Sequence, residues 1–157
     1  MKKSILLVAL LVFVVGCESK KEVAQETSSV KKNYIAQGFA LLDQKNIKGA
    51  IASFDLAIKQ DPRNVDNYIT LGQVYLKLNN ASRAIDSFTA ATKVSPTNGE
   101  AHQLLATALG LRNENESDRK GAIAAAQRSA EIFMNRKDQL NFKKSLSLVK
   151  SLEERFQ

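Results

Sequence analysis

The sequence is poor in the side chains that carry most protein chemistry. Its 157 residues include one cysteine, Cys17, one histidine, His102, and no tryptophan. A single cysteine excludes an internal disulfide and leaves no thiol pair for a redox centre or a zinc site. A single histidine excludes a two-histidine metal site, and the isolated Gly110 and Gly121 do not form a phosphate-binding loop. We therefore expect no catalytic residue, no metal site and no enzyme activity.

Proline is also scarce, and its two copies, Pro62 and Pro96, occupy equivalent places in a repeat of 34 residues. Residues 31–64 and 65–98 align without a gap. The matched positions are Tyr34 and Tyr68, Gly38 and Gly72, Leu41 and Tyr75, Ala50 and Ala84, Phe54 and Phe88, and Ala57 and Ala91. A fixed period of this length indicates a solenoid of stacked helix pairs, in which neighbouring units bury a continuous core.

This pattern resembles the tetratricopeptide repeat, and the resemblance covers most of the chain beyond residue 30. It implies an all-α, tetratricopeptide-type α-solenoid over residues 31–157. About three helix-turn-helix repeats are expected, at 31–64, 65–98 and 99–134, with a capping helix at 138–155. The resemblance also implies a rigid binding surface with no chemistry of its own.

Apolar spacing with the helical period runs through the whole repeat region. It predicts helices at 31–44, 47–60, 64–78, 81–94, 98–113, 118–134 and 138–155. We expect Asp61-Pro62 and Ser95-Pro96 to separate the pairs, with the polar residue as cap and the proline starting the next helix. In the third pair His102 stands in the tyrosine position and Ala122 falls four residues late. That insertion is expected to lengthen either the first helix or the loop.

The final segment has one predicted apolar face, made of Phe142, Leu146, Val149, Leu152 and Phe156. A terminal helix with one apolar and one charged face is suited to covering the open end of a stack. The alternative is an amphipathic helix that docks a membrane or a second copy.

The start of the chain is typical of an exported protein. Lys2 and Lys3 precede an apolar run of 11 residues, from Ile5 to Val15, which is too short to span a bilayer but suits a secretory signal over residues 1–16. The run ends in Val14-Val15-Gly16-Cys17, which resembles the lipobox of bacterial lipoproteins. The resemblance implies cleavage before Cys17, followed by attachment of diacylglycerol and an acyl chain, and no other cofactor is expected. A transmembrane helix or an uncleaved signal is the alternative.

Residues 17–30 contain the cysteine and a polar segment that cannot bury enough surface to fold, so we expect a flexible tether. The lipid chains would place the protein at the cell membrane. Glu18 after the cysteine favours the outer membrane, facing the periplasm, if the source is Gram-negative. Without Lys2 and Lys3, 21 basic residues remain against 16 acidic ones. This balance favours anionic headgroups or an acidic partner over nucleic acid, which an exported chain rarely meets.

In tetratricopeptide proteins the first helix of each pair lines the concave face, and the resemblance places partner contacts there. They are Lys32, Ile35, Phe39 and Leu42 in the first pair, Ile69, Gln73 and Leu76 in the second, and Gln103, Leu104 and Thr107 in the third. Ile35 and Phe39 occupy places that clamp a carboxylate in the best-known family mode, and Glu100 stands where a lysine is expected. We therefore expect an apolar groove that accepts an amphipathic helix or an extended apolar peptide.

An alternative is that Phe39, Leu42 and Leu76 pack against helix 138–155 or a neighbouring molecule. The sequence thus predicts a lipid-anchored scaffold or adaptor of the bacterial envelope, with a protein partner held in the groove. The second hypothesis is a self-associating structural envelope protein that forms a homo-oligomer through its last helix.

Overall fold

Seven α-helices make up the part of the chain that the computed structural model describes, residues 33–157. They are α1 (Tyr34–Asp43), α2 (Ile47–Gln60), α3 (Val65–Lys77), α4 (Ala81–Val94), α5 (Gly99–Arg112), α6 (Glu116–Asn135) and α7 (Gln139–Phe156). This range contains no strand. The predicted signal at 1–16, Cys17, the tether at 17–30 and Lys32 lie outside the described residues.

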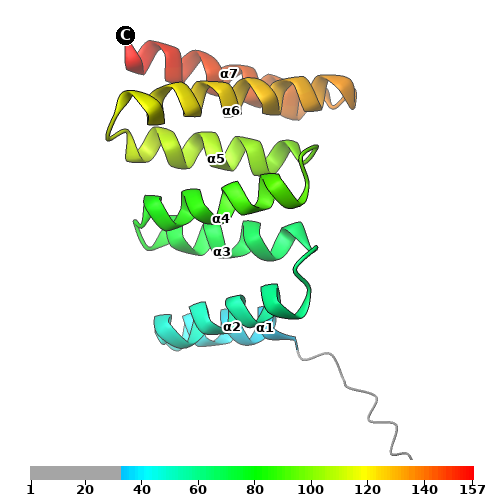
Figure 1. Cartoon of the computed structure of the whole chain (residues 1–157), viewed down its shortest axis with the longest axis vertical. Helices are drawn as coiled ribbons and strands as arrows, with labels where there is room; N and C mark the ends of the chain where they lie inside the picture. Colours follow the sequence, from blue (N-terminus) through cyan, green and yellow to red (C-terminus); the bar gives the residue numbers. More distant parts are fainter. Residues whose placement is uncertain (1–32) are drawn as a thin grey trace, which may run out of the picture. The chain divides into compact units, whose positions relative to one another are not determined.

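The helices pack in the order in which they follow one another along the chain (Figure 1). Helices α1 and α2, α3 and α4, and α5 and α6 form antiparallel hairpins, and α7 packs on α6. Between hairpins, α4 packs broadly on α5, whereas the contact of α2 with α3 is smaller. Consecutive packing of this kind is the solenoid arrangement that the repeat predicts.

Asparagine begins almost every helix. The N-caps of α1 to α6 are Asn33, Asn46, Asn64, Asn80, Asn98 and Asn115, and the side-chain oxygen of each accepts a hydrogen bond from a backbone N–H of the first turn. The prediction that the prolines start helices was wrong. Helix α3 begins at Val65, and Pro62 lies in the preceding turn, because the cap is supplied by Asn64 rather than by Asp61.

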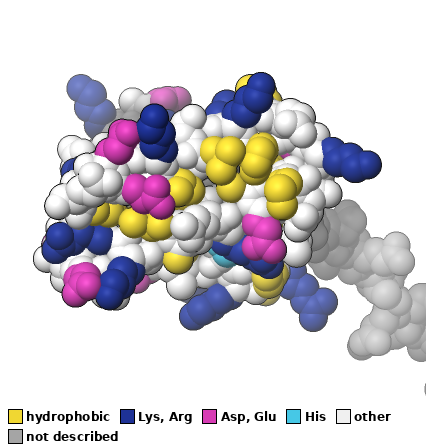
Figure 2. Space-filling view, turned by 90° about the horizontal axis from the view of Figure 1, so that it is seen from above, with side chains coloured by type: hydrophobic (Ala, Val, Ile, Leu, Met, Phe, Trp, Pro, Cys, Tyr) yellow, Lys and Arg dark blue, Asp and Glu magenta, His cyan; other side chains and the backbone are white. Residues whose placement is uncertain are grey.

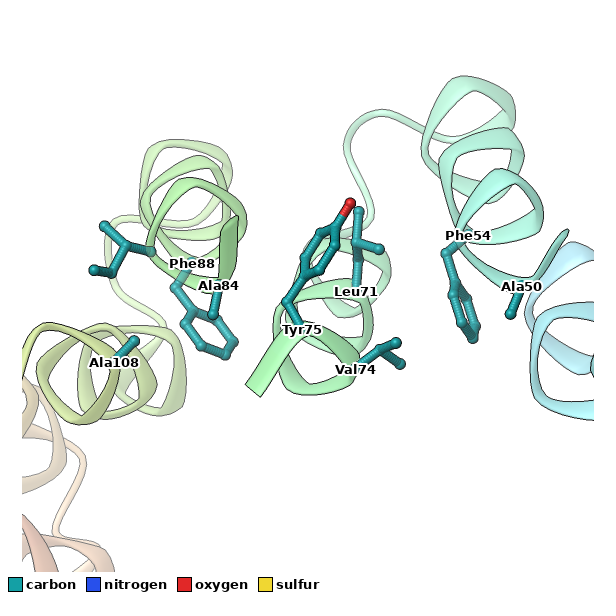
Figure 3. Packing of buried hydrophobic residues seen from close by; sticks show 9 residues of the cluster. Ala50, Phe54, Leu71, Val74, Tyr75, Ala84, Phe88 and Ala108 are labelled. Atoms are coloured by element: carbon teal, nitrogen blue, oxygen red, sulfur yellow. The ribbon is translucent and has the colours of Figure 1, made fainter. Parts of the chain in front are cut away.

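A glycine and a phenylalanine hold each of the first two hairpins together. A Cβ on Gly38 would stand 2.5 Å from Cε1 of Phe54, and one on Gly72 would stand 2.5 Å from Cε1 of Phe88. Both phenylalanines are fully buried, and Figure 3 shows the Phe88 ring between α3, which carries Tyr75, and Ala108 of α5. The glycines therefore allow an approach that any larger residue would prevent.

The third hairpin reaches the same arrangement with different residues. Ala106 and Ala126, which occupy the glycine and phenylalanine positions, are both fully buried in one cluster. The four extra residues do not lengthen the loop, because the turn at 113–115 is as long as the turn at 78–80. Helix α5 has 14 residues and α3 has 13, but α6 has 20 where α4 has 14. The predicted extra turn in the first helix and the predicted longer loop were both wrong: α5 gains one residue, and the other three lie in the first turn of α6.

An ion pair fixes the start of the lengthened helix α6. The buried carboxylate of Asp118 accepts hydrogen bonds from Nε of Arg112 at 2.9 Å and from the backbone N–H of Glu114 at 3.0 Å. Its own N–H donates to the cap residue Asn115. The hydrogen bond from Arg112 is the main reason why the pKa of Asp118 is lowered. The helix therefore begins two residues before the predicted position 118.

Helix α7 covers α6 with a face that differs from the predicted one. Leu152 and Ser145 are buried, but Leu146, expected on the same face, is 47% exposed. The Ser145 hydroxyl donates to Oγ of Ser129 at 2.9 Å, because the Ser129 proton is already donated to the Gly99 carbonyl at 2.8 Å. This chain of hydrogen bonds joins α7, α6 and the start of α5.

Candidate interaction surface

The clearest hollow on a predicted binding helix is a pocket of about 440 Å³ between α5 and α7. Three of the predicted contact residues, Gln103, Leu104 and Thr107, line it from α5. Helix α6 and the turn after it contribute Phe133 and Arg136, and α7 contributes Asn141 and Lys144. The floor therefore combines apolar groups with hydrogen-bonding and charged ones.

Sequence reasoning missed the residues that α6 and α7 supply to this pocket. The order of the helices could have indicated them. Helix α7 follows the third hairpin in the same way that α5 follows the second, so the inner side of α7 lies beside the inner side of α5. The sequence predicted residues 138–155 to be a cap or a helix that docks a membrane or a second copy, and neither interpretation includes a pocket lining. The pocket is consequently more polar than the apolar groove that the sequence predicted.

The charged groups of the pocket are held in place by neighbouring hydrogen bonds. Arg136 donates from Nη2 to the Thr97 carbonyl at 2.6 Å. Asn141 donates from Nδ2 to Asp138 at 2.7 Å, and Lys144 lies 3.4 Å from Oδ1 of Asn141. With Glu100 as the acidic lining residue, the pocket has two cations and one anion. This balance suits an anionic or hydrogen-bonding group of a ligand.

The predicted contacts on α1 differ in how much of each side chain is available. Phe39 is 44% exposed, and its ring meets that of the buried Phe54 edge to face, with centroids 5.3 Å apart and an interplanar angle of 73°. Ile35 and Leu42 are half-buried and pack on the core. Phe39 is thus the prominent apolar side chain among the described α1 contacts, while Lys32 falls outside the described range.

The α3 contacts are split between core and surface. Ile69 is only 6% exposed and packs with Ala91 and Ala101, so little of it is open to a partner. Leu76 is half-buried against the core, and Gln73 is exposed. Leu42 and Leu76 pack on the cluster built from α2 to α5, whereas α7 packs on α6 and to a smaller extent on α5. These contacts account for the leucines without the predicted packing against the last helix.

His102 serves as a spacer in the structure. Its Nε2 lies 3.1 Å from the Pro96 carbonyl, which repeats the hydrogen bond from the Tyr68 hydroxyl to the Pro62 carbonyl one period earlier. A carbonyl only accepts, so Nε2 carries the proton. Burial is the main cause of the lowered pKa of His102, and the positive charge of Arg128 also lowers it.

Residues 33–157 contain neither a metal-binding cluster nor a membrane-spanning helix. No group of three or more His, Cys, Asp and Glu side chains in this range is placed to hold a metal ion. None of the helices from α1 to α7 combines the length and the apolar character needed to cross a bilayer.

Comparisons with known proteins identify the fold. A family model described as tetratricopeptide repeat matches residues 41–108. The fold is a tetratricopeptide-type α-solenoid. This confirms the predicted fold class, and the fold is typical of non-enzymatic scaffolds that bind other proteins.

Solved structures resemble the chain over most of its length. The N-terminal domain of stress-induced protein-1 (STI-1) from C. elegans has 23% identity and a TM-score of 0.59, over 73% of this chain and 91% of that one. The crystal structure of MamA has 21% identity and a TM-score of 0.52, over 74% of each chain. At such identities the likeness concerns the fold alone. A comparison with curated proteins gave no match.

Proposed function

We propose that the protein is a lipid-anchored scaffold of the bacterial envelope, which holds a segment of a partner protein against the inner helices α1, α3, α5 and α7. The observation that carries this proposal is the pocket of about 440 Å³, because predicted contact residues of α5 line it together with Arg136 and Lys144. A concave site with a few convergent polar groups is the usual form of a binding site.

The character of this surface defines the segment that would fit it. Exposed Phe39 offers an apolar contact at one end, and the pocket offers two cations, one carboxylate, three side-chain amides and a hydroxyl at the other. The ligand expected is therefore an extended or helical segment with an apolar anchor and an acidic or hydrogen-bonding group. The protein would hold this segment without reacting with it.

Membrane attachment is the second part of the proposal, and its support lies in the sequence. Cys17 follows a signal-like apolar run and a small residue, Gly16, as lipid-modified cysteines do. Diacylglycerol and an acyl chain on Cys17 would bury enough methylene groups for stable anchoring. Replacing Cys17 by Ser should move the protein from the membrane fraction to the soluble fraction, and the mass of the N-terminal peptide of the wild type should include the acyl chains. An unmodified wild-type peptide would contradict the anchor.

The binding surface is tested by Phe39→Asp, with Leu56→Asp as the matched control. The two side chains have similar exposure, 44% and 41%, but Leu56 belongs to α2, the second helix of its pair. Loss of one apolar anchor should weaken recovery of the crosslinked partner from membranes by about 10- to 100-fold. The control should recover it normally.

Because Phe39 also touches the core residue Phe54, a second variant is needed. Lys144→Glu alters an exposed pocket residue without removing a buried side chain. It should also reduce recovery of the same partner while the free energy of unfolding stays unchanged. Normal recovery with both Phe39→Asp and Lys144→Glu would contradict the proposed surface.

A further inference from the structure

One side of α7 lacks the cover that the corresponding side of α3 and α5 receives. Gly72, Ala106 and Leu146 are each the eighth residue of their helix, in α3, α5 and α7. Phe88 of α4 lies over Gly72, and Ala106 is fully buried against α6. Leu146, in contrast, is 47% exposed. The position that packs against the following helix in two hairpins is thus occupied by a large exposed apolar side chain in α7.

Neighbouring residues extend this exposed side along the helix. Phe142 and Val149 lie one turn before and after Leu146; both are partly buried, and Val149 also packs on the cluster around Ala122. In the view from the α7 end of the stack, apolar side chains gather between basic and acidic ones (Figure 2). A terminal helix that only shields a core needs a polar outer surface. We refer to Phe142, Leu146 and Val149 as the α7 stripe.

Charges beside the α7 stripe indicate what covers it. Lys143 lies near its first half and Glu153 near its second half, on the side of the helix that carries Leu146. In an antiparallel pair of α7 helices with the twofold axis near Leu148, Lys143 of one copy stands level with Glu153 of the other. The two Leu146 residues then lie two residues on either side of the axis, about 6 Å apart along the pair.

We propose that two copies of the chain pair through the α7 stripe, with their α7 helices antiparallel. The interface is isologous, because each copy presents the same residues to the other. The α7 stripe is distinct from the pocket between α5 and α7, so a dimer leaves the partner-binding surface free. This inference does not depend on the proposed function.

The size of α7 limits the strength of this contact. A helix of 18 residues is about 27 Å long, and a single pair of such helices buries less than a standard protein interface. The expected association is a reversible monomer–dimer equilibrium with a Kd on the order of 10 µM. Attachment of both copies to one membrane would favour the dimer by raising the local concentration.

The test is sedimentation equilibrium of the full chain in detergent, comparing Leu146→Glu with Leu140→Glu. Leu140 is the more exposed leucine, at 64%, but it lies six residues earlier and points to another side of the helix. Wild type and Leu140→Glu should dimerise equally, and Leu146→Glu should weaken dimerisation at least about tenfold. Both leucines are exposed, so neither variant removes a buried side chain.

A charge exchange adds the specificity that a general loss of apolar surface would not show. Lys143→Glu should weaken the dimer by placing like charges together, and Lys143→Glu with Glu153→Lys should restore it. A monomeric wild type at about 100 µM, well above the expected Kd, would overturn the proposal. Equal effects of the two leucine variants would do so as well. Unchanged dimerisation of Leu146→Glu with weaker binding to anionic vesicles would instead assign the α7 stripe to a membrane surface.

Discussion

The second and third hairpins pack two helices closely with opposite choices of side chain. The α3–α4 hairpin combines the smallest residue, Gly72, with the large Phe88, whereas the α5–α6 hairpin combines Ala106 with Ala126. All four residues are buried. The comparison shows that two helices can be packed closely either with a large ring over a glycine or with two small residues that meet.

The hairpins also differ in how they gain stability beyond this contact. The second depends on an aromatic core, with Phe88 and Tyr75 buried. The third has no such aromatic contact at Ala126 and buries a charged group, Asp118, and the fully buried Ser129, both hydrogen-bonded. Polar groups keep their place in a core only when they are fully paired. The third hairpin should therefore be more sensitive to the loss of single hydrogen bonds.

The largest effect is expected for the glycine–phenylalanine pair. Phe88→Ala removes a fully buried ring and should lower the free energy of unfolding by about 3–5 kcal/mol. Gly72→Ala forces a Cβ against that ring and should cost about 1–3 kcal/mol. The double variant places two alanines together, as in the third hairpin, so its cost should be well below the sum of the costs of the two single variants. Urea denaturation of the four chains measures this coupling, and strict additivity would show that the two residues do not act as a pair.

The reverse exchange in the third hairpin is the matched control. Ala126→Phe should destabilise the protein because Ala106 leaves no room for the ring, and adding Ala106→Gly should recover part of that loss. If Ala106→Gly makes Ala126→Phe worse, the equivalence of the two hairpins is wrong.

A smaller effect is expected for Asp118→Asn, which removes the charge that holds Arg112 and the start of α6. The cost should be about 2–3 kcal/mol near neutral pH. Pairing lowers the pKa of Asp118, so the native state binds fewer protons than the unfolded state. The contribution of the pair is therefore complete above the unfolded pKa near 3.8 and is lost as the pH falls through the lower native value. Denaturation should show that the free energy of unfolding of the variant differs from that of the wild type at pH 7 and approaches it in strong acid. A difference that stays constant with pH would exclude the ion pair as the source of the effect.

Ser129→Ala tests the hydrogen bonds of the third hairpin directly. Alanine occupies this place in the first two hairpins, as Ala57 and Ala91, but here the substitution removes the hydrogen-bond partner of the Ser145 hydroxyl and one of the hydrogen bonds to the Gly99 carbonyl. We expect a loss of about 1–2 kcal/mol in thermal or urea unfolding. The double variant Ser129→Ala with Ser145→Ala should cost less than the sum of the two. Stabilisation by Ser129→Ala would mean that the repeat pattern outweighs the local hydrogen bonds.

The smallest effect is expected for His102→Tyr, which restores the repeat residue and offers a hydroxyl to the Pro96 carbonyl. Stability at pH 7 should change by less than about 0.5 kcal/mol. Burial lowers the pKa of His102, so the wild type should lose stability as the pH falls below its unfolded pKa of about 6.5. The tyrosine chain should lack this dependence. If the free energy of unfolding changes equally with pH in both chains between pH 7 and pH 5, His102 is not the source of the pH dependence.

The fold followed from the sequence because the 34-residue period fixes which small and large residues meet. The predictions that failed concerned contacts made by residues that are not part of the repeated pattern. The asparagine caps were overlooked in favour of Asp61 and Ser95, and the position of the insertion was set by the buried Asp118. The pocket was only partly predicted, because Arg136 and Lys144 reach it from outside the three repeats.

The most direct test of the account is site-specific photocrosslinking in intact cells, from Gln103 in the pocket and from Leu56 on α2. Both sites belong to the same folded unit, so they differ in the surface that they sample. The account predicts that a probe at Gln103 captures one protein reproducibly, that the Lys144→Glu substitution reduces this capture, and that a probe at Leu56 does not give it. Capture of the same protein from Leu56 alone, or from both sites regardless of Lys144→Glu, would contradict binding at the inner surface.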